Sequence, residues 1–164
     1  MTILCRYIAK GLEYVVGGLF IAIAATALAQ VFTRYVLSNS LTWTHELDIL
    51  LMIWAVWLGA GIGIHRKAHL RISILRDRLS EANQKILTVV IDLLTLTFLV
   101  VLGWKGIAVL ESVEGTVLTS MDLPRGIVVS AAPVGAGFMV LFFLPILFED
   151  FRSLFVLSRK GEKS

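Results

Sequence analysis

The sequence predicts an all-α membrane protein with four transmembrane helices and both termini in the cytoplasm. Its 164 residues are 57% hydrophobic and 16% charged, with a mean hydropathy of +0.85. Soluble domains are usually about 45–50% apolar and about 25% charged. Several apolar runs reach the roughly 20 residues that a helix needs to cross a bilayer, and the basic residues gather on one side of them. This composition excludes a disordered chain and a nucleic-acid-binding arm, and it argues against a soluble enzyme.

Four apolar runs predict the spans in order. Residues 14–33 and 126–148 contain no charged side chain, and 86–104 are interrupted only by Asp92. The run 49–64 is shorter, and the apolar residues before it extend it into the interface. The chain is therefore expected to form one membrane domain, residues 1–164, with spans at about 12–36, 47–64, 86–110 and 126–148.

The first run allows a second interpretation, a cleaved signal peptide. Ala-Leu-Ala at 27–29 resembles a signal-peptidase site, and Arg6 and Lys10 would supply the positive n-region. The apolar stretch nevertheless continues to Val36. We therefore expect an uncleaved membrane anchor.

The distribution of basic residues predicts the orientation. The N-terminal segment 1–11, the loop 65–85 and the tail 149–164 hold 12 of the 15 Lys and Arg residues, and the other two loops hold 3. Because basic residues are retained in the cytoplasm, both termini are predicted to lie there. Apolar residues at helical spacing among the basic ones also predict short amphipathic interfacial helices in 1–11 and 65–85. For the loop, a solvated charged face remains an equal alternative; its headgroup-binding candidates are Arg66, Lys67, Arg71, Arg76 and Arg78.

Residues that carry chemistry are sparse. One cysteine, Cys5, cannot form an intrachain disulfide, and neither a phosphate-binding GxxxxGK[ST] loop nor an HExxH zinc motif occurs. His65 and His69 have the spacing of two metal ligands, but the basic residues around them would repel a cation. We therefore predict no catalytic residue, cofactor or metal. Asp92 is an acid inside a span, which leaves a structural pairing and a functional role both open.

Helix-packing positions are indicated within the second span. Trp54 and Trp57 lie deep in it, one helical turn apart, and are expected to fill a contact between helices. Gly59 and Gly63 form a GxxxG motif, which allows close approach of a neighbouring helix. Ordinary packing within the chain is the commoner cause of that motif. In the fourth span, Pro133 and Pro145 are expected to produce kinks.

On the outer side, Trp43 is placed for an interfacial aromatic belt. Arg34 ends the first span and Glu46 opens the second, so an ion pair between them is expected to fix the short loop. The outer segments carry five acids against three bases, a surface that could dock a basic protein or simply mirror the cytoplasmic bias.

Several motifs in order resemble a known family, the small membrane (Q-type, DctQ-like) subunit of tripartite ATP-independent periplasmic (TRAP) transporters. That family typically reads RYV, W-x-E-E-L, W-x-x-FLGA and R-x-x-x-H-I-x-V-D. The matching segments are RYV at 34–36, SLTWTHEL at 40–47, WAVWLGA at 54–60 and HLRI at 69–72. Three positions depart from the pattern: His45 replaces the first acid, Ser73 stands where Asp is frequent, and Arg125 stands where an aromatic residue is common.

The resemblance implies an accessory role in the bacterial inner membrane. A large multi-span TRAP subunit would carry the substrate and sodium sites, and a periplasmic binding protein would deliver an organic acid anion. This chain would scaffold the large subunit, contact phospholipids and help to dock the binding protein, with no nucleic-acid partner and no enzymatic activity. The candidate partner or structural residues are Arg34, Trp43, Glu46, Trp54, Trp57, Gly59, Gly63, His69 and Asp92.

Two alternatives come from other classes of membrane protein. The first is a stand-alone small secondary transporter that uses Asp92 as its coupling residue. The second is a membrane anchor of a respiratory enzyme, but haem ligation needs histidines inside spans. All three histidines fall at or outside the predicted helix ends, which disfavours the second.

Overall fold

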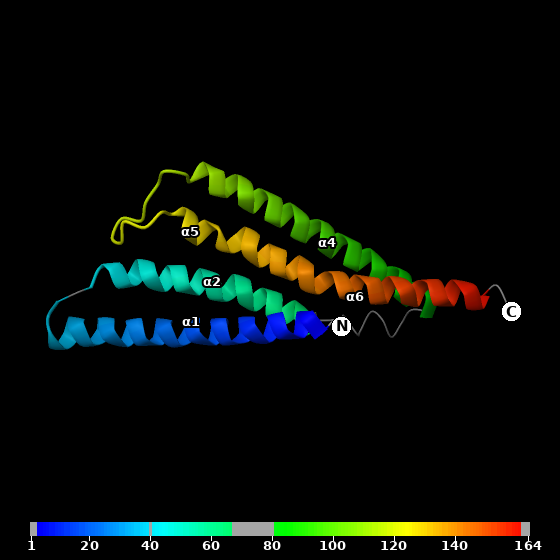
Figure 1. Ribbon diagram of the computed structural model, residues 1–164, viewed down its shortest axis with the longest axis horizontal. Helices are drawn as coiled ribbons and strands as arrows, with labels where there is room; N and C mark the ends of the chain where they lie inside the picture. Colours follow the sequence, from blue (N-terminus) through cyan, green and yellow to red (C-terminus); the bar gives the residue numbers. More distant parts are fainter. Residues whose placement is uncertain (1–2, 40, 67–80, 162–164) are drawn as a thin grey trace.

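The computed structural model describes residues 3–39, 41–66 and 81–161. Within these ranges the chain is helical, with four long helices and one short one (Figure 1). Each long helix contains a stretch apolar and long enough to cross a membrane, which confirms the prediction of four long apolar helices. The helices are α1 (Ile3–Val36), α2 (Trp43–His65), α4 (Glu81–Ser112), α5 (Gly126–Val129) and α6 (Ala131–Gly161).

All four long helices exceed the thickness of the hydrocarbon core, α2 with 23 residues only slightly and the other three by far. α1 has 34 residues, α4 has 32 and α6 has 31, whereas about 20 residues suffice to cross about 30 Å. α1 runs without interruption through the N-terminal segment that was expected to lie along the interface. The interfacial helix expected in the loop 65–85 falls mostly on residues 67–80, outside the described residues.

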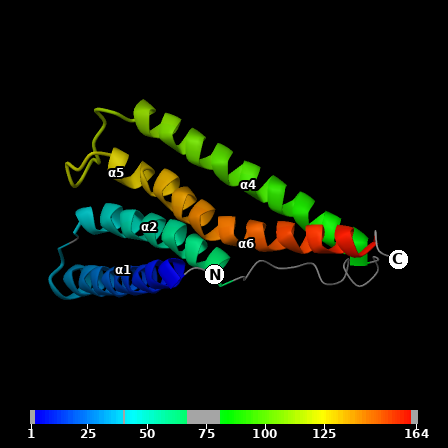
Figure 2. The ribbon, with the colours of Figure 1, turned by 45° about the vertical axis from the view of Figure 1, so that its right-hand side comes forward.

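The long helices form an open row in the order α1, α2, α6, α4 (Figures 1 and 2). α1 packs against α2, α2 against α6, and α6 against α4. Residues 37–39 and 113–125 lie at one end of the row, and the N-terminus of α1 and the C-terminus of α6 point toward the other (Figure 1). Because the row does not close, α1 and α4 each lie beside one long helix along most of their length, and in the described part of the chain most of their surface stays uncovered.

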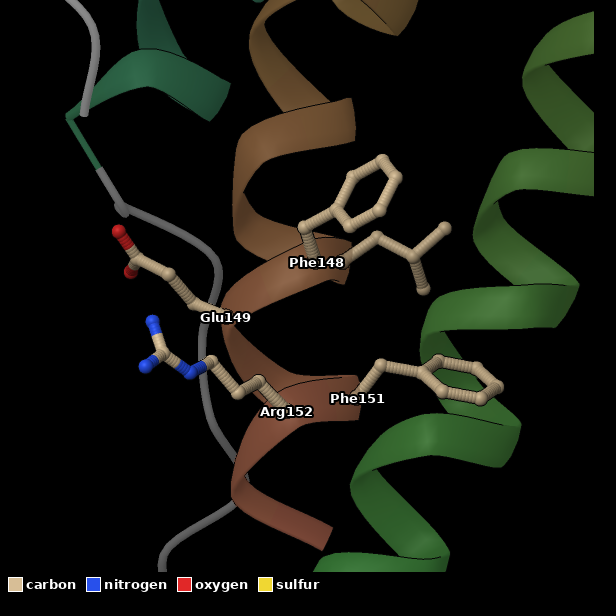
Figure 3. A pocket seen from close by; sticks show the side chains of 5 residues that line it. Phe148, Glu149, Phe151 and Arg152 are labelled. Carbon is tan, nitrogen blue, oxygen red and sulfur yellow. The ribbon is translucent and has the colours of Figure 1, made fainter. Parts of the chain in front are cut away.

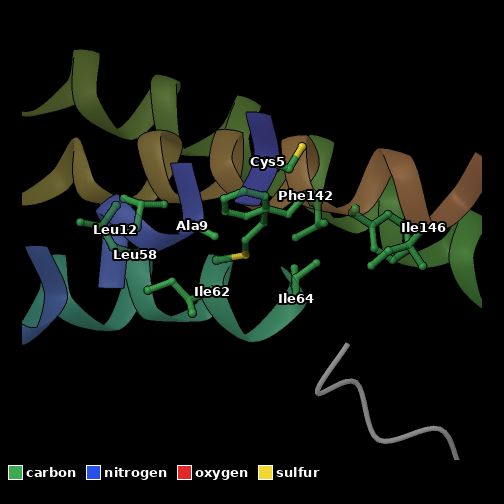
Figure 4. Close-up of a cluster of buried hydrophobic side chains, with 11 residues drawn as sticks. Cys5, Ala9, Leu12, Leu58, Ile62, Ile64, Phe142 and Ile146 are labelled. Atoms are coloured by element: carbon green, nitrogen blue, oxygen red, sulfur yellow. The ribbon is translucent and has the colours of Figure 1, made fainter. Parts of the chain in front are cut away.

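The hydrophobic core lies where the beginning of α1, the end of α2 and the middle of α6 meet (Figure 4). Phe142 is almost fully buried at its centre, and the ring of His65 packs against it with ring centroids 5.1 Å apart. α4 contributes Leu99. The other buried members are Cys5, Ala9, Leu12, Leu58, Ile62, Ile64, Met139, Phe143 and Ile146.

Two glycines allow the helices of the row to approach closely. A Cβ atom placed on Gly135 of α6 would lie 2.8 Å from the Cβ of Trp57 in α2. A Cβ on Gly106 of α4 would lie 3.1 Å from Cδ of Pro133 in α6. Small residues are the usual means of bringing helices together in lipid, where burial of apolar surface supplies little drive.

Pro133 lies in the first turn of α6, just after the break that separates α5 from α6 at Ser130. Proline has no N–H to donate to the carbonyl four residues earlier, so an uninterrupted helix is disfavoured at this point. The interruption therefore agrees with the kink predicted near Pro133. Pro145, by contrast, lies within the continuous helix α6.

Candidate functional site

A short hairpin, residues 113–125, covers the N-terminal end of α2. It leaves α4 through Gly115, whose φ of +77° favours glycine. Leu118 N–H donates to Leu123 O at 2.8 Å, and Arg125 N–H donates to Thr116 O at 2.9 Å. These two bonds pair the arms of the hairpin, residues 116–118 and 123–125, in antiparallel fashion. Residues 119–122 form its tip, which lies at the end of the helix row.

Glu46 binds the tip of this hairpin. Its Oε1 accepts the backbone N–H of Thr119 at 3.1 Å, and its Oε2 accepts the N–H of Ser120 at 2.8 Å. The expected ion pair between Arg34 and Glu46 is absent among the described residues. The guanidinium of Arg34 lies instead over the ring of Tyr35, 5.9 Å from its centroid. The local loop therefore does not supply the partner of Glu46; a segment more than 70 residues away does.

Two polar contacts join α1 to α2, one toward each end of α2. The Thr26 hydroxyl donates to Asp48 Oδ1 between partly buried faces of the two helices. Near the other end, Arg66 donates from Nε and Nη2 to Glu13 Oε1, at 3.2 and 2.8 Å. Both Arg66 and Glu13 are largely solvent-accessible, with side-chain exposures of 64% and 37%. Arg66, a candidate for phospholipid headgroups, is thus partly occupied by Glu13.

The two tryptophans of α2 contact α5 and α6. Trp54 Nε1 donates to the carbonyl of Ile127 at 3.0 Å. Ile127 lies in α5, just before the break between α5 and α6. Trp57 packs under Gly135. Trp43, the first residue of α2, stays 41% exposed, as an interfacial aromatic side chain would.

The GxxxG motif of α2 lies on an open face. A Cβ placed on Gly59 or Gly63 would have no heavy atom within 4 Å. The glycine of α2 that does pack within the chain is Gly61, whose Cβ would lie 3.4 Å from that of Phe138. Packing within the chain therefore does not explain Gly59 and Gly63 among the described residues.

Asp92 lies on the seam between α4 and α6. It is 8% exposed and precedes Gly106 by two heptads, so both residues face the same neighbour. Because Gly106 meets Pro133 of α6 and the two helices run in opposite directions, Asp92 is level with about residue 147. α2 has already ended at His65, which packs against Phe142, so Asp92 lies beyond the end of α2, level with the margin of the core at Ile146.

The surface of the outer helices in the row is strongly apolar. No residue in the most apolar stretch of α1 is buried, and exposed aromatic and aliphatic side chains follow both α1 and α4. Such continuous apolar surface requires a cover of lipid or another protein. Its larger members include Phe20, Ile21, Leu28 and Phe32 on α1 and Leu94, Phe98 and Trp104 on α4.

Described residues line an open cavity at each end of the row. One, of about 600 Å³, is lined by Leu147, Phe148, Glu149, Phe151 and Arg152 of α6. Figure 3 shows Phe148 and Phe151 directed toward α4 and the two charged side chains on the other side of α6. The second cavity, of about 360 Å³, lies between the end of α4 and the 113–125 hairpin.

Some sequence-predicted residues lie outside the described residues, namely His69, Lys67, Arg71, Arg76 and Arg78. Sequence reasoning also missed the polar contacts between Thr26 and Asp48, between Arg66 and Glu13, between Trp54 and Ile127, and between Glu46 and the hairpin tip. Thr26 and Asp48 carried a signal, because they are a hydroxyl and a carboxylate in neighbouring apolar runs. The amides of the hairpin tip carried none, because every residue type has a backbone N–H.

Comparison with known proteins gives the family. Residues 23–153 match the family model described as tripartite ATP-independent periplasmic transporters, DctQ component. The sialic acid TRAP transporter small permease protein SiaQ of Vibrio cholerae is 26% identical over 149 residues, which cover 89% of this chain and 84% of that one. The ectoine TRAP transporter small permease protein TeaB of Halomonas elongata is 27% identical over 127 residues, covering 76% and 66%.

A third relative is much longer than this chain. The sialic acid TRAP transporter permease protein SiaT of Haemophilus influenzae is 26% identical over 148 residues. These residues cover 90% of this chain but 24% of SiaT. The chain thus spans about a quarter of that permease.

The family model covers most of the chain, and it includes α2, the 113–125 hairpin and the whole of α4 and α5. The match confirms the resemblance seen in the sequence motifs and assigns the chain to transport rather than enzymatic catalysis. The chain belongs to the DctQ family, the small permease component of tripartite ATP-independent periplasmic transporters, and is a multi-pass membrane protein.

Proposed function

We propose that this chain is the small accessory membrane subunit of a sodium-driven, binding-protein-dependent TRAP transporter for organic acid anions. In this proposal a large multi-span subunit carries the substrate and sodium sites. The present chain scaffolds that subunit and helps to dock the periplasmic binding protein. Support for a large partner comes from SiaT, a single polypeptide in which the matching region is about a quarter of the length.

The observation that carries the proposal is the open row of helices. α1 and α4 each leave most of their apolar surface uncovered, as expected of a subunit that adds to a larger membrane scaffold. Two polar side chains inside the apolar helices join one helix to another, since Thr26 bonds Asp48 and Trp54 bonds Ile127, whereas Thr95 and Thr97 bond carbonyls of their own helix. A scaffold needs such contacts, whereas a transporter needs polar groups gathered around a substrate near the midplane.

The proposed orientation places the loop 65–85 and both termini in the cytoplasm. The support is the 12-to-3 distribution of basic residues. Residues 37–39 and the 113–125 hairpin, which share one end of the row (Figure 1), would then face the periplasm. The basic residues at the cytoplasmic end would contact phospholipid headgroups.

The alternative is a stand-alone small transporter that uses Asp92 for coupling. The burial of Asp92 on the seam between α4 and α6 is the observation in its favour. Its position beyond the end of α2 argues against it, because a coupling site is expected near the middle of the helices that enclose it.

Reconstituted uptake tests the proposal. The large permease of the same system is incorporated into liposomes with and without this chain, and uptake of radiolabelled substrate is driven by a sodium gradient in the presence of the loaded binding protein. The proposal predicts uptake only when both membrane proteins are present, and none from this chain alone. Uptake by this chain alone would contradict it.

A further inference from the structure

The 113–125 hairpin exposes side chains of its tip and of both arms at one end of the row. Val117 is 53% exposed, and Asp122 and Arg125 are also exposed. Asp122 adopts a φ of +50°, a conformation that Asp tolerates better than most residues. The hairpin therefore offers one apolar and two oppositely charged side chains to whatever approaches this end.

The described hydrogen bonds within the hairpin lie near its base. They pair Thr116 with Arg125 and Leu118 with Leu123, and leave the amides of Thr119 and Ser120 to Glu46. A short two-stranded hairpin is marginally stable by itself. Its tip consequently needs a contact with the helices to hold one orientation.

Glu46 supplies that contact. Its two carboxylate oxygens each accept one amide N–H from adjacent residues of the tip. Bonds to an ionised acceptor are about twice as strong as neutral ones. Glu46 itself lies in the first turn of α2, where the helix dipole favours a negative charge.

We propose that Glu46 is a positioning residue, which locks the 113–125 hairpin onto α2 so that its tip forms part of the docking surface for the periplasmic binding protein. This inference rests on the proposed function and adds to it the element that docks and the residue that orients it. The docking surface is the exposed part of the hairpin, with Asp122 at the tip and Val117 and Arg125 on the two arms. One apolar and two oppositely charged side chains suit a polar protein surface with an apolar centre.

The acids expected to form an acidic docking face are only partly available. Among the outer acids, Glu46 binds the hairpin tip and Asp48 binds Thr26. The charged residues that remain at this end are balanced, so electrostatic attraction alone does not define the surface. They are the acids Glu111, Glu114 and Asp122 and the bases Arg34, Lys105 and Arg125. The shape of the locked hairpin defines the surface instead.

The test compares Glu46→Gln with Glu111→Gln in the purified transporter complex, held in nanodiscs of phosphatidylethanolamine and phosphatidylglycerol. Glutamine is isosteric with glutamate but accepts through one oxygen, so it can keep one of the two bonds to the tip. Glu111 lies exposed in the last turn of α4 and is the matched control. Glu46→Ala removes both bonds.

Two quantities are measured for each variant. Hydrogen exchange is followed by mass spectrometry in peptides that cover the hairpin, and the dissociation constant of the substrate-loaded binding protein is measured by surface plasmon resonance. We expect Glu46→Gln to speed exchange of the Thr119 and Ser120 amides about tenfold and to weaken binding severalfold. Glu46→Ala should do more, and Glu111→Gln should change neither quantity.

Unchanged exchange in both Glu46 variants would overturn the lock, and faster exchange with unchanged affinity would overturn its role in docking. Failure of the wild-type complex to bind the binding protein would overturn the proposed function as well. A wild-type complex that binds, with variants that bind equally well, would overturn this inference alone.

Discussion

Replacing Gly135 with alanine should separate α2 from α6. The new Cβ would lie 2.8 Å from Cβ of Trp57 and 3.1 Å from the backbone oxygen of Trp57. Ordinary carbon–carbon contacts are about 3.5–4.0 Å, so the helices must move apart by about 0.7 Å or more. Since backbone atoms are involved, rotation of a side chain cannot relieve the contact. A shift of that size along the bond would also stretch the Trp54–Ile127 hydrogen bond, now 3.0 Å, past its normal range.

The magnitude follows from a matched pair of glycines. Overpacking usually costs about 1–3 kcal/mol, whereas alanine is favoured over glycine in a helix by about 1 kcal/mol. Gly137→Ala, two residues along α6, places its Cβ in open space. It should therefore gain the helix propensity of alanine without any steric cost. The difference in unfolding free energy between Gly135→Ala and Gly137→Ala therefore isolates the steric cost, about 1–3 kcal/mol.

Equilibrium unfolding of the full-length chain measures this difference. Dodecylmaltoside micelles are titrated with sodium dodecyl sulfate, and tryptophan fluorescence follows unfolding, since Trp54 and Trp57 lie at the affected contact. If the two alanine variants agree within about 0.5 kcal/mol, then α2 and α6 do not approach at Gly135 and the order of the row is wrong.

Three further predictions concern polar groups. Thr26→Val keeps the shape of the side chain but loses its bond to the α2 carboxylate, and should lower unfolding stability by about 0.6–2 kcal/mol; Thr97→Val, whose hydroxyl bonds within α4, should cost less in the same titration. A double-mutant cycle with Arg66→Gln and Glu13→Gln should give a coupling below about 1 kcal/mol that declines at high salt, because the pair is exposed. A coupling that persists in 1 M salt would show a buried pair instead. Asp92→Asn should leave substrate uptake by the reconstituted complex near that of the wild type, and loss of all uptake would favour the stand-alone transporter.

The helices themselves could be predicted from the sequence because each apolar run is long and carries few charges. Their ends could not. α1 continues through the basic residues Arg6 and Lys10, since neither residue type opposes helix formation. The helical spacing of the apolar residues in segment 1–11 is equally compatible with a separate interfacial helix and with one continuous helix.

The partners of individual side chains were harder to predict. Arg34 and Glu46 are close along the chain, which suggested an ion pair. Glu46 instead accepts two adjacent backbone amides of the hairpin tip, and backbone donors cannot be recognised from the residue types. Gly59 and Gly63 have the GxxxG spacing, yet Gly135 and Gly106 make the close approaches. A spacing motif identifies a face of one helix, and only the arrangement of the other helices determines what covers that face.

The proposed accessory role is tested most directly by recovering the tagged chain from its native membrane in a mild detergent and identifying by mass spectrometry what elutes with it. The proposal predicts one large polytopic membrane protein at near-equal stoichiometry. Elution of the chain alone, or as a homodimer that transports substrate in liposomes, would contradict it and would make Asp92 the residue to study.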